Sequence, residues 1–262
     1  MKKNQLFFLL FIAILFLSAC AGDNFEDKYP AKPSIDNPEG KLAHFALDGT
    51  LENSEETGYH LFLYGEETYS DGGVGGSQAL ELNGESNYLA IPIGVHDTLS
   101  IVFWVRMNGE NFREKNANPV WLDYSAGAVK VAVDGITGST KLLMTENSRS
   151  DVETSLLLPN GEWENICTWQ KRAFFYTEIL SDSVTYRIKT QHEEDNMKDY
   201  TLRVSLKESP LDLKSEWLYI GKPSGMETAV GKYLEGIIDD IDIYNRGLTE
   251  DEVKSFAQVS LE

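Results

Sequence analysis

Cysteine is nearly absent from this sequence: its 262 residues include only Cys20 and Cys167. So low a number excludes a disulfide-dense scaffold. Histidine is scarce as well, and its four positions form no HExxH motif or catalytic triad pattern. Basic residues are outnumbered, with 23 Lys and Arg against 42 Asp and Glu, for a formal net charge of −19. This balance predicts no nucleic-acid partner, because contacts with phosphates require a basic surface.

Apolar residues are plentiful, at 42% of the chain, which is enough for one large core. Short strand-like runs separated by Gly, Asn and Asp recur along the sequence, and only its last turns are helical. In Leu99–Arg106 both alternating faces are apolar, as in the inner strand of a two-layer sandwich. Earlier in the chain, Asn83-Gly84 predicts a tight hairpin. These features indicate an all-β fold.

The run Ile237–Tyr244 places acids inside a strand-like stretch. Side chains alternate between the two faces of a strand, so Asp239 is predicted to share a face with Ile237, Ile241 and Ile243. A buried carboxylate is costly unless it is paired, bound to a metal or fully hydrogen-bonded. If Asp239 is buried, another part of the chain must therefore provide its charged partner, its hydrogen-bond donors or the other ligands of a metal ion.

A short helix is predicted after this run. Thr249 is a favourable N-cap, and Glu252, three residues later, completes a capping box. Leu248 and Val253 occupy the two positions of a hydrophobic staple. The local sequence therefore specifies where the helix begins and which side of it docks.

The stretch Tyr219-Ile220-Gly221, followed by Gly236 to Glu252, resembles the C-terminal signature of LamG-like (laminin G type) domains. These domains belong to the concanavalin A-like lectin/glucanase superfamily. The opening run, from Leu42 to Leu51, is similar to the opening of the same family. The resemblance implies a two-sheet antiparallel jelly-roll sandwich, concanavalin A-like, with a short C-terminal helix.

The N-terminus begins with basic residues and the apolar run Leu6–Leu17, which is too short for a comfortable membrane span and typical of a signal peptide. The run ends in the sequence LSAC, up to Cys20, which resembles a bacterial lipobox. The resemblance implies lipidation of Cys20 and anchoring at the bacterial outer membrane or cell surface; an ordinary signal peptide with a chance cysteine is the alternative. We expect a signal peptide, a lipidated tether and the sandwich at residues 1–19, 20–40 and 41–262.

Many LamG-like domains hold one calcium ion where the first and last strands meet. The resemblance places Asp48, Asn53 and Asp239 at this site, which implies one structural Ca²⁺. Asn53 stands where the family has an acid, which lowers the charge of the site. In the alternative interpretation, Asp239 accepts hydrogen bonds from backbone N–H groups or from Arg246.

Sugar-binding sites combine a flat aromatic ring with polar groups that fix the hydroxyls. On this criterion the candidates are Trp104 with Arg106, Trp121 with Tyr124, and Trp169. The alternative for each ring is a place in the core, where most aromatic residues of a sandwich lie.

The Glu-x-Asp-x-x-Glu run of the family's glucanases is absent from the sequence, so we expect no enzyme activity. By analogy with the family we expect non-catalytic recognition of a glycan. A protein-binding or adhesion module, with a surface protein as partner, is the alternative. A glycoside hydrolase whose site cannot be recognised from the sequence is a further one.

Overall fold

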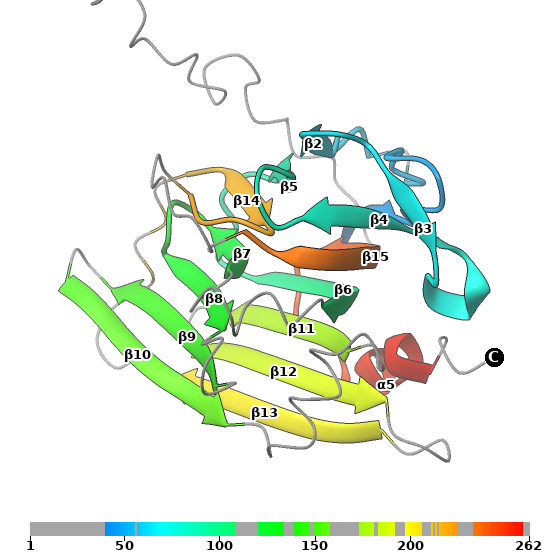
Figure 1. The fold of residues 1–262 in the computed structure, drawn as a ribbon. Coiled ribbons are helices and arrows are strands. Elements are labelled where there is room, and N and C mark those ends of the chain that lie inside the picture. The colour runs from blue at the N-terminus through cyan, green and yellow to red at the C-terminus, as the bar shows by residue number, and fades with distance from the viewer. Residues whose placement is uncertain are drawn as a thin grey trace, which may run out of the picture. The chain divides into compact units, whose positions relative to one another are not determined.

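The structure is a computed structural model, and the residues that it describes all lie within Lys32–Glu262 (Figure 1). The described ranges are 40–55, 57–107, 120–133, 139–146, 149–157, 173–180, 183–191, 197–205, 211, 213, 215–224 and 233–258. Within these ranges no helix is both long and apolar enough to span a membrane.

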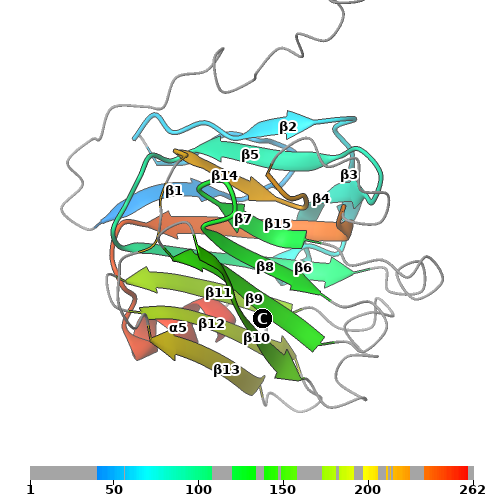
Figure 2. The same cartoon turned by 90° about the vertical axis from the view of Figure 1, so that its left-hand side faces the viewer.

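The described strands form two antiparallel sheets. The first sheet follows the order β13-β12-β11-β6-β15-β4-β3, and β1 is paired with β15 as well. Its strands are β1 Lys41–Phe45, β3 Tyr69–Asp71, β4 Gln78–Asn83, β6 Leu99–Met107, β11 Ala173–Leu180, β12 Ser183–Gln191, β13 Met197–Ser205 and β15 Glu235–Tyr244. The first and last strands of the described chain are thus direct neighbours, as Figure 2 shows.

The second sheet follows the order β10-β9-β8-β7-β14-β5-β2. Its strands are β2 Phe62–Tyr64, β5 Tyr88–Pro92, β7 Val120–Tyr124, β8 Val129–Val133, β9 Ser139–Glu146, β10 Arg149–Leu157 and β14 Trp217–Ile220. The only other described elements are the short 3-10 helix η2, Val74–Gly76, and the helix α5, Glu250–Gln258. The prediction of an all-β, two-sheet sandwich with a short C-terminal helix is confirmed.

The core lies between the two sheets. Strand β6 shows the expected alternation, with Ile101, Phe103 and Val105 in the large core cluster that both sheets build. Val102 and Trp104 point the other way and belong to a smaller cluster on the outer face of the first sheet. Strand β6 is therefore buried on both faces, as its sequence predicts.

The hairpin expected at Asn83-Gly84 is wrong, because β4 and β5 belong to different sheets. The side-chain Oδ1 of Asn83 accepts hydrogen bonds from the backbone N–H groups of Glu85, Ser86 and Asn87, at 3.0, 2.9 and 3.0 Å. This side chain therefore shapes a loop that crosses from one sheet to the other.

Helix α5 begins as the sequence predicts. The backbone N–H of Thr249 donates to Glu252 Oε2 at 2.8 Å, and that of Glu252 donates to Thr249 Oγ1 at 3.3 Å, which is a capping box. Val253 is buried in the outer cluster and Leu248 packs against it. The helix thus covers part of the outer face of the first sheet.

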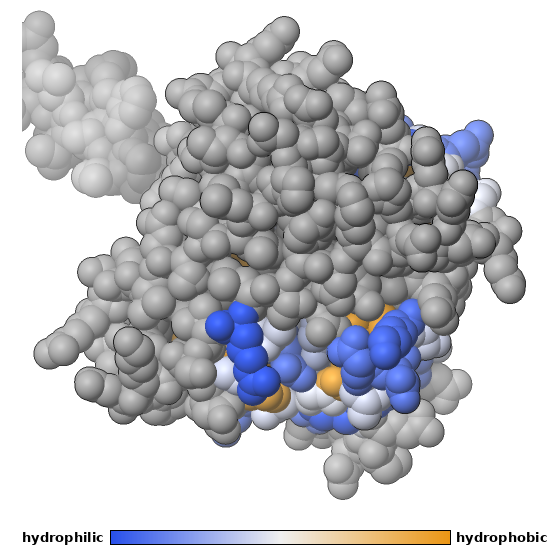
Figure 3. Space-filling model, turned by 90° about the horizontal axis from the view of Figure 1, so that it is seen from below, coloured by the Kyte–Doolittle hydropathy of each residue, from blue (hydrophilic) through white to orange (hydrophobic). Residues whose placement is uncertain are grey.

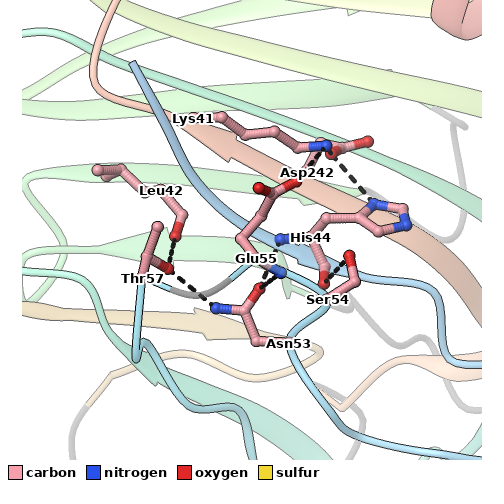
Figure 4. A network of polar contacts seen from close by, with 8 residues as sticks. All are labelled: Lys41, Leu42, His44, Asn53, Ser54, Glu55, Thr57 and Asp242. Atoms are coloured by element: carbon pink, nitrogen blue, oxygen red, sulfur yellow. Dashed lines mark hydrogen bonds and ion pairs between the residues drawn. The ribbon is translucent and has the colours of Figure 1, made fainter. Parts of the chain in front are cut away.

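A polar network holds β1 to β15 (Figure 4). Asp242 Oδ1 lies 3.1 Å from Nδ1 of His44 and 3.0 Å from Nζ of Lys41, and the same ammonium lies 3.0 Å from Glu55. The hydrogen bond with Asp242 raises the pKa of His44 above its ordinary value. The protonated imidazole is therefore the form that stabilises this pairing.

Replacing His44 with Gln should remove a stabilisation that exists only at low pH. Because the folded pKa is raised, this stabilisation is complete below the unfolded pKa of 6.5 and is lost as the pH rises through the folded value. We expect the variant to lose about 1 kcal/mol more unfolding free energy at about pH 5.5 than at about pH 9. Denaturant titrations of both proteins measure this, with the exposed His60→Gln as control. An equal loss at both pH values would contradict the assignment.

Candidate functional site

Strand β15 contains a β-bulge at its acidic residues. Asp239 pairs with Trp104 of β6 and Asp242 with Val102, so that Asp240 and Ile241 together oppose a single residue of β6. Asp240 has a φ of 47°, in the left-handed region that side chains other than Gly rarely adopt. The extra residue reverses the alternation of the strand from this point on.

The predicted facing of β15 is therefore wrong in one respect. Ile241 and Ile243 lie in the core between the sheets, together with Ile238. Asp239 and Ile237 lie instead on the outer face, beside Trp104. Strict alternation across the acids does not hold, because the bulge inserts one residue between the two halves of the strand.

Asp239 is buried on that outer face, only 4% exposed, beneath the glycine-rich connection between β3 and β4. Its Oδ2 accepts the backbone N–H of Val74 at 2.5 Å and the hydroxyl of Ser77 at 3.4 Å. A Cβ on Gly73 would come within 2.6 Å of the same oxygen, so glycine is required there. Its Oδ1 has no hydrogen-bond partner among the described residues. Burial raises the pKa of Asp239 to about 7.

The hydrogen-bonding interpretation of Asp239 is correct for the backbone donor and wrong for Arg246. The guanidinium of Arg246 instead pairs with Glu252 at 2.6 and 3.0 Å, which ties the end of β15 to α5. The acid is thus held by the β3–β4 connection and not by the residue after its own strand.

The expected calcium ligands do not fit together as a site. Asn53 Oδ1 accepts the backbone N–H groups of His44 and Glu55, both at 3.0 Å, and its Nδ2 donates to Thr57 and to the carbonyl of Tyr59. Both lone pairs of this oxygen are occupied, so Asn53 supplies no ligand (Figure 4). Asp48 is exposed, and within the described ranges no three His, Cys, Asp or Glu side chains are grouped to hold a metal. The described residues therefore do not support this calcium site.

Three of the expected sugar-binding aromatics lie in the interior. Trp104 is 3% exposed, while Trp121 and Tyr124 are fully buried. The hydroxyl of Tyr124 donates to the carbonyl of Gly94 and accepts the N–H of His96. A ring without an exposed face offers a sugar no surface for stacking, so these assignments are corrected to core roles.

Of the other two expected residues, Arg106 is half-buried on the outer face of the first sheet, where burial lowers its pKa. Trp169 lies outside the described residues. The described members of the expected sugar-binding set are thus not assembled on one accessible surface.

A different aromatic surface lies on the outer face of the second sheet. We call it the aromatic face and define it by seven residues of β2, β5, β14 and the segments that follow β14. Its members are Phe62, Tyr64, Tyr88, Trp217, Tyr219, Lys222 and Tyr233. The residues that alternate with these rings, including Leu89, Leu218 and Ile220, belong to the core between the sheets. Alternation therefore directs the rings outward.

The rings of the aromatic face surround a small residue. Ala90 of β5 is in register with Phe62 on one side and with Tyr219 on the other. The ring centroid of Trp217 lies 6.3 Å from those of Phe62 and of Tyr219. The absence of a large side chain at the centre lets the flanking rings approach one another.

Tyr64 and Tyr88 extend this surface, and the ammonium of Lys222 lies over the ring of Tyr88. Tyr64 and Tyr88 are in register and stack with centroids 4.3 Å apart and planes 6° from parallel. Lys222 Nζ lies 4.2 Å from the ring centroid of Tyr88 and 5.3 Å from that of Tyr219. These distances are those of cation–π contacts. Phe62, Tyr64 and Tyr88 are half-buried, whereas Trp217 and Tyr219 are only 3% and 7% exposed and pack beside them. The face therefore combines a few half-buried rings with a charged hydrogen-bond donor.

A buried acid positions the segment that carries Lys222. Asp123 of β7 is fully buried and in register with Tyr219. Its carboxylate accepts the backbone N–H groups of Gly127 at 2.8 Å and Ser224 at 2.9 Å, and lies 3.5 Å from Nζ of Lys130. Burial raises the pKa of Asp123, and these partners offset part of that cost. Asp123 is thus a structural anchor for the aromatic face.

Sequence reasoning missed the aromatic face, although a signal was present. Phe62-Leu63-Tyr64 and Trp217-Leu218-Tyr219 each alternate aromatic and aliphatic residues, which predicts aromatic rings on one side of a strand. The side chains coloured in Figure 3 are mostly hydrophilic with a few apolar ones between them, and Val95 is the one large apolar residue that is highly exposed among those described.

Comparison with known proteins supports the fold. No family model and no curated protein matches the chain. Among solved structures, the binding domain of Paraclostridial Mosquitocidal Protein 1 is 15% identical with a TM-score of 0.60, covering 83% of this chain and 52% of that domain. The binding domain of botulinum neurotoxin serotype D/C VPI 5993 is 12% identical with a TM-score of 0.59, covering 86% and 53%.

A third similar structure is the binding domain of botulinum neurotoxin DC in complex with SialylT. It is 14% identical with a TM-score of 0.54, covering 86% of this chain and 52% of that domain. The chain thus spans about half the length of these domains. At such low identity the likeness shows a shared β-sandwich architecture and not a shared ligand.

Replacing Asp239 with Asn should flatten the dependence of stability on pH. The unfolded carboxyl loses its proton near its ordinary pKa of 3.8 and the folded one near 7, so the unfolding free energy of the parent protein falls as the pH rises between these values. Asn still accepts the N–H of Val74 and carries no charge. We expect the variant to lose about 3 kcal/mol less than the parent between about pH 4 and pH 7.5.

Denaturant titrations at the two pH values measure this difference. Asp71→Asn is the control, since it removes an exposed carboxyl of the same sheet and leaves Asp239 and its neighbours in place. Parallel pH profiles for the parent and Asp239→Asn would show that the acid is not held protonated beneath the β3–β4 connection.

Proposed function

We propose that this chain is a non-catalytic glycan-binding module that uses the aromatic face. The observation that carries the proposal is the half-buried, stacked pair Tyr64 and Tyr88, with the ammonium of Lys222 over the ring of Tyr88. Stacking on half-buried aromatic rings and hydrogen bonding from a fixed donor are the two elements that recognition of a sugar requires. The aromatic face thereby replaces the ring set that the sequence suggested.

The similar structures support a binding role without naming the ligand. Their names describe binding domains, one in complex with SialylT and one in complex with rat synaptotagmin II. Proteins of this architecture thus form complexes with a glycan in one case and with a protein in another. This chain matches only about half of each domain. The aromatic face favours the glycan, because the ammonium of Lys222 lies over two of its rings and interrupts the apolar surface.

The proposal includes a family and a location. The sequence signatures support a LamG-like sandwich over residues 41–262, lipidated at Cys20 and held at the bacterial outer membrane or cell surface by a tether over residues 20–40. On this proposal the aromatic face samples glycans outside the cell.

Replacing Tyr88 with Leu should weaken glycan binding without unfolding the sandwich. Tyr88 stacks with Tyr64, contacts Tyr219 and carries the Lys222 ammonium, so its loss removes the centre of the surface. We expect the signal on a glycan array to fall by about tenfold or more. Tyr69→Leu is the matched control, since Tyr69 is a half-buried tyrosine of the other sheet.

Two outcomes would contradict this proposal. Retention of the glycan signal in Tyr88→Leu would place the site elsewhere. Absence of any glycan signal from the parent protein, together with tight capture of a surface protein, would favour the adhesion alternative instead.

Replacing Cys20 with Ser should release the protein from the membrane. The thiol is the only group that the lipobox-like sequence offers for a lipid, and hydroxyl replacement removes it. In a bacterial expression host that processes lipoproteins, we expect labelled fatty acid in the parent protein and none in the variant. Cys167→Ser, which should keep the label, is the control. A label on neither protein would reject the lipid anchor and leave the glycan proposal unaffected.

A further inference from the structure

The cation on the aromatic face belongs to the chain itself. Lys222 Nζ lies against the rings of Tyr88 and Tyr219, and the ring of Tyr233 lies 6.2 Å from that of Tyr88, at an interplanar angle of 48°. An ammonium against two rings, with a third tilted ring beside one of them, forms a partial aromatic cage. Such cages bind ammonium groups through the negative faces of the rings, whichever molecule supplies the group.

An acidic hollow begins at the residues adjacent to this cage in the chain. It has a volume of about 410 Å³ and its walls include three carboxylates, those of Glu66, Glu81 and Glu235. Asn87, which precedes Tyr88, lies in its wall as well. The hollow adds negative charge near the end of β5 at which Tyr88 lies, on a chain whose net charge is already −19. Anionic sugars are disfavoured there, and cationic groups are attracted.

We propose that the ligand of the aromatic face is a glycan with free amino groups, and that Lys222 occupies the ammonium position of the ligand in the unbound protein. This inference rests on the proposed function and specifies its ligand. The sugar rings stack on the tyrosines while one ligand ammonium takes the place of Lys222 in the cage. The carboxylates near that end of β5 attract further ammonium groups of the ligand at longer range.

The role given to Lys222 has an unusual consequence. If Lys222 contacted an acidic or neutral sugar directly, its removal would weaken binding. As an internal occupant that the ligand must displace, it opposes binding instead, and its removal strengthens binding. The sign of the Lys222→Met effect therefore separates the two roles, and Met keeps the unbranched apolar stem.

The test is isothermal titration calorimetry of the full chain with two oligosaccharides of equal length. One is a β-1,4-linked tetramer of glucosamine and the other is its N-acetylated counterpart. At low ionic strength and at a pH where the amines are charged, we expect the amine form to bind about tenfold more tightly. This preference should shrink as salt is added. Lys222→Met should bind the amine form about threefold more tightly than the parent does.

Each alternative result has a distinct meaning. Equal or tighter binding of the N-acetylated tetramer overturns the inference and leaves glycan binding intact. Weaker binding of the amine form by Lys222→Met likewise overturns it, since Lys222 would then be a ligand contact. Should that variant fail to fold, the preference of the parent protein still decides the ligand class. Failure of both tetramers and of a full glycan array would reject the proposed function itself.

Discussion

Strand β15 pairs with three other strands, and its bulge determines which of its side chains lie on each face of the first sheet. Its first half pairs with β4, its second half with β1, and β6 runs along its other edge. The left-handed conformation of Asp240 lets the isoleucines on both sides of the bulge reach the core. The same conformation turns Asp239 outward, under the glycine-rich connection that covers it. Local strain at one residue is thus offset by the packing of the whole sheet.

The two sheets use their outer faces differently. On the first sheet, α5 and η2 contribute Val253 and Val74 to a cluster that covers Val102 and Trp104. That face is closed by the chain itself, which is why its tryptophan cannot meet a ligand. On the second sheet, Phe62, Tyr64 and Tyr88 remain half-buried. The contrast explains how a sandwich with aromatic residues in most of its strands presents only some of them for binding.

Local signals in the sequence were sufficient for much of the fold. The alternation in β6 predicted two buried faces, and the Thr249–Glu252 pair predicted the start of α5. The bulge was missed: the pair Asp239-Asp240 interrupts the alternation of apolar and polar residues in the sequence, but only the pairing with β6 shows that one residue there is extra. The hairpin at Asn83-Gly84 failed for a related reason, since the turn residues do not say which sheet the next strand joins.

The candidate site was harder to predict than the fold. Trp104 and Trp121 carry the features of sugar-binding rings in the sequence, and burial depends on elements far away in the chain. Ala90 could not be identified from the sequence, because its small side chain matters only by leaving room for the rings of Phe62 and Tyr219 on the neighbouring strands. Such a feature is a property of three neighbouring strands and not of any one segment.

The position of β15 between strands from the beginning and middle of the sequence has a consequence for biogenesis. Until residues 235–244 have been synthesised, β1 and β6 lack the strand that pairs with both of them, and the backbone groups along one edge of β6 have no strand partner. The first sheet can close only after residues 235–244 have left the ribosome. Assembly then depends on contacts between segments roughly 200 residues apart, an arrangement associated with slow folding. The growing chain therefore has a long period in which holding chaperones would protect it from aggregation.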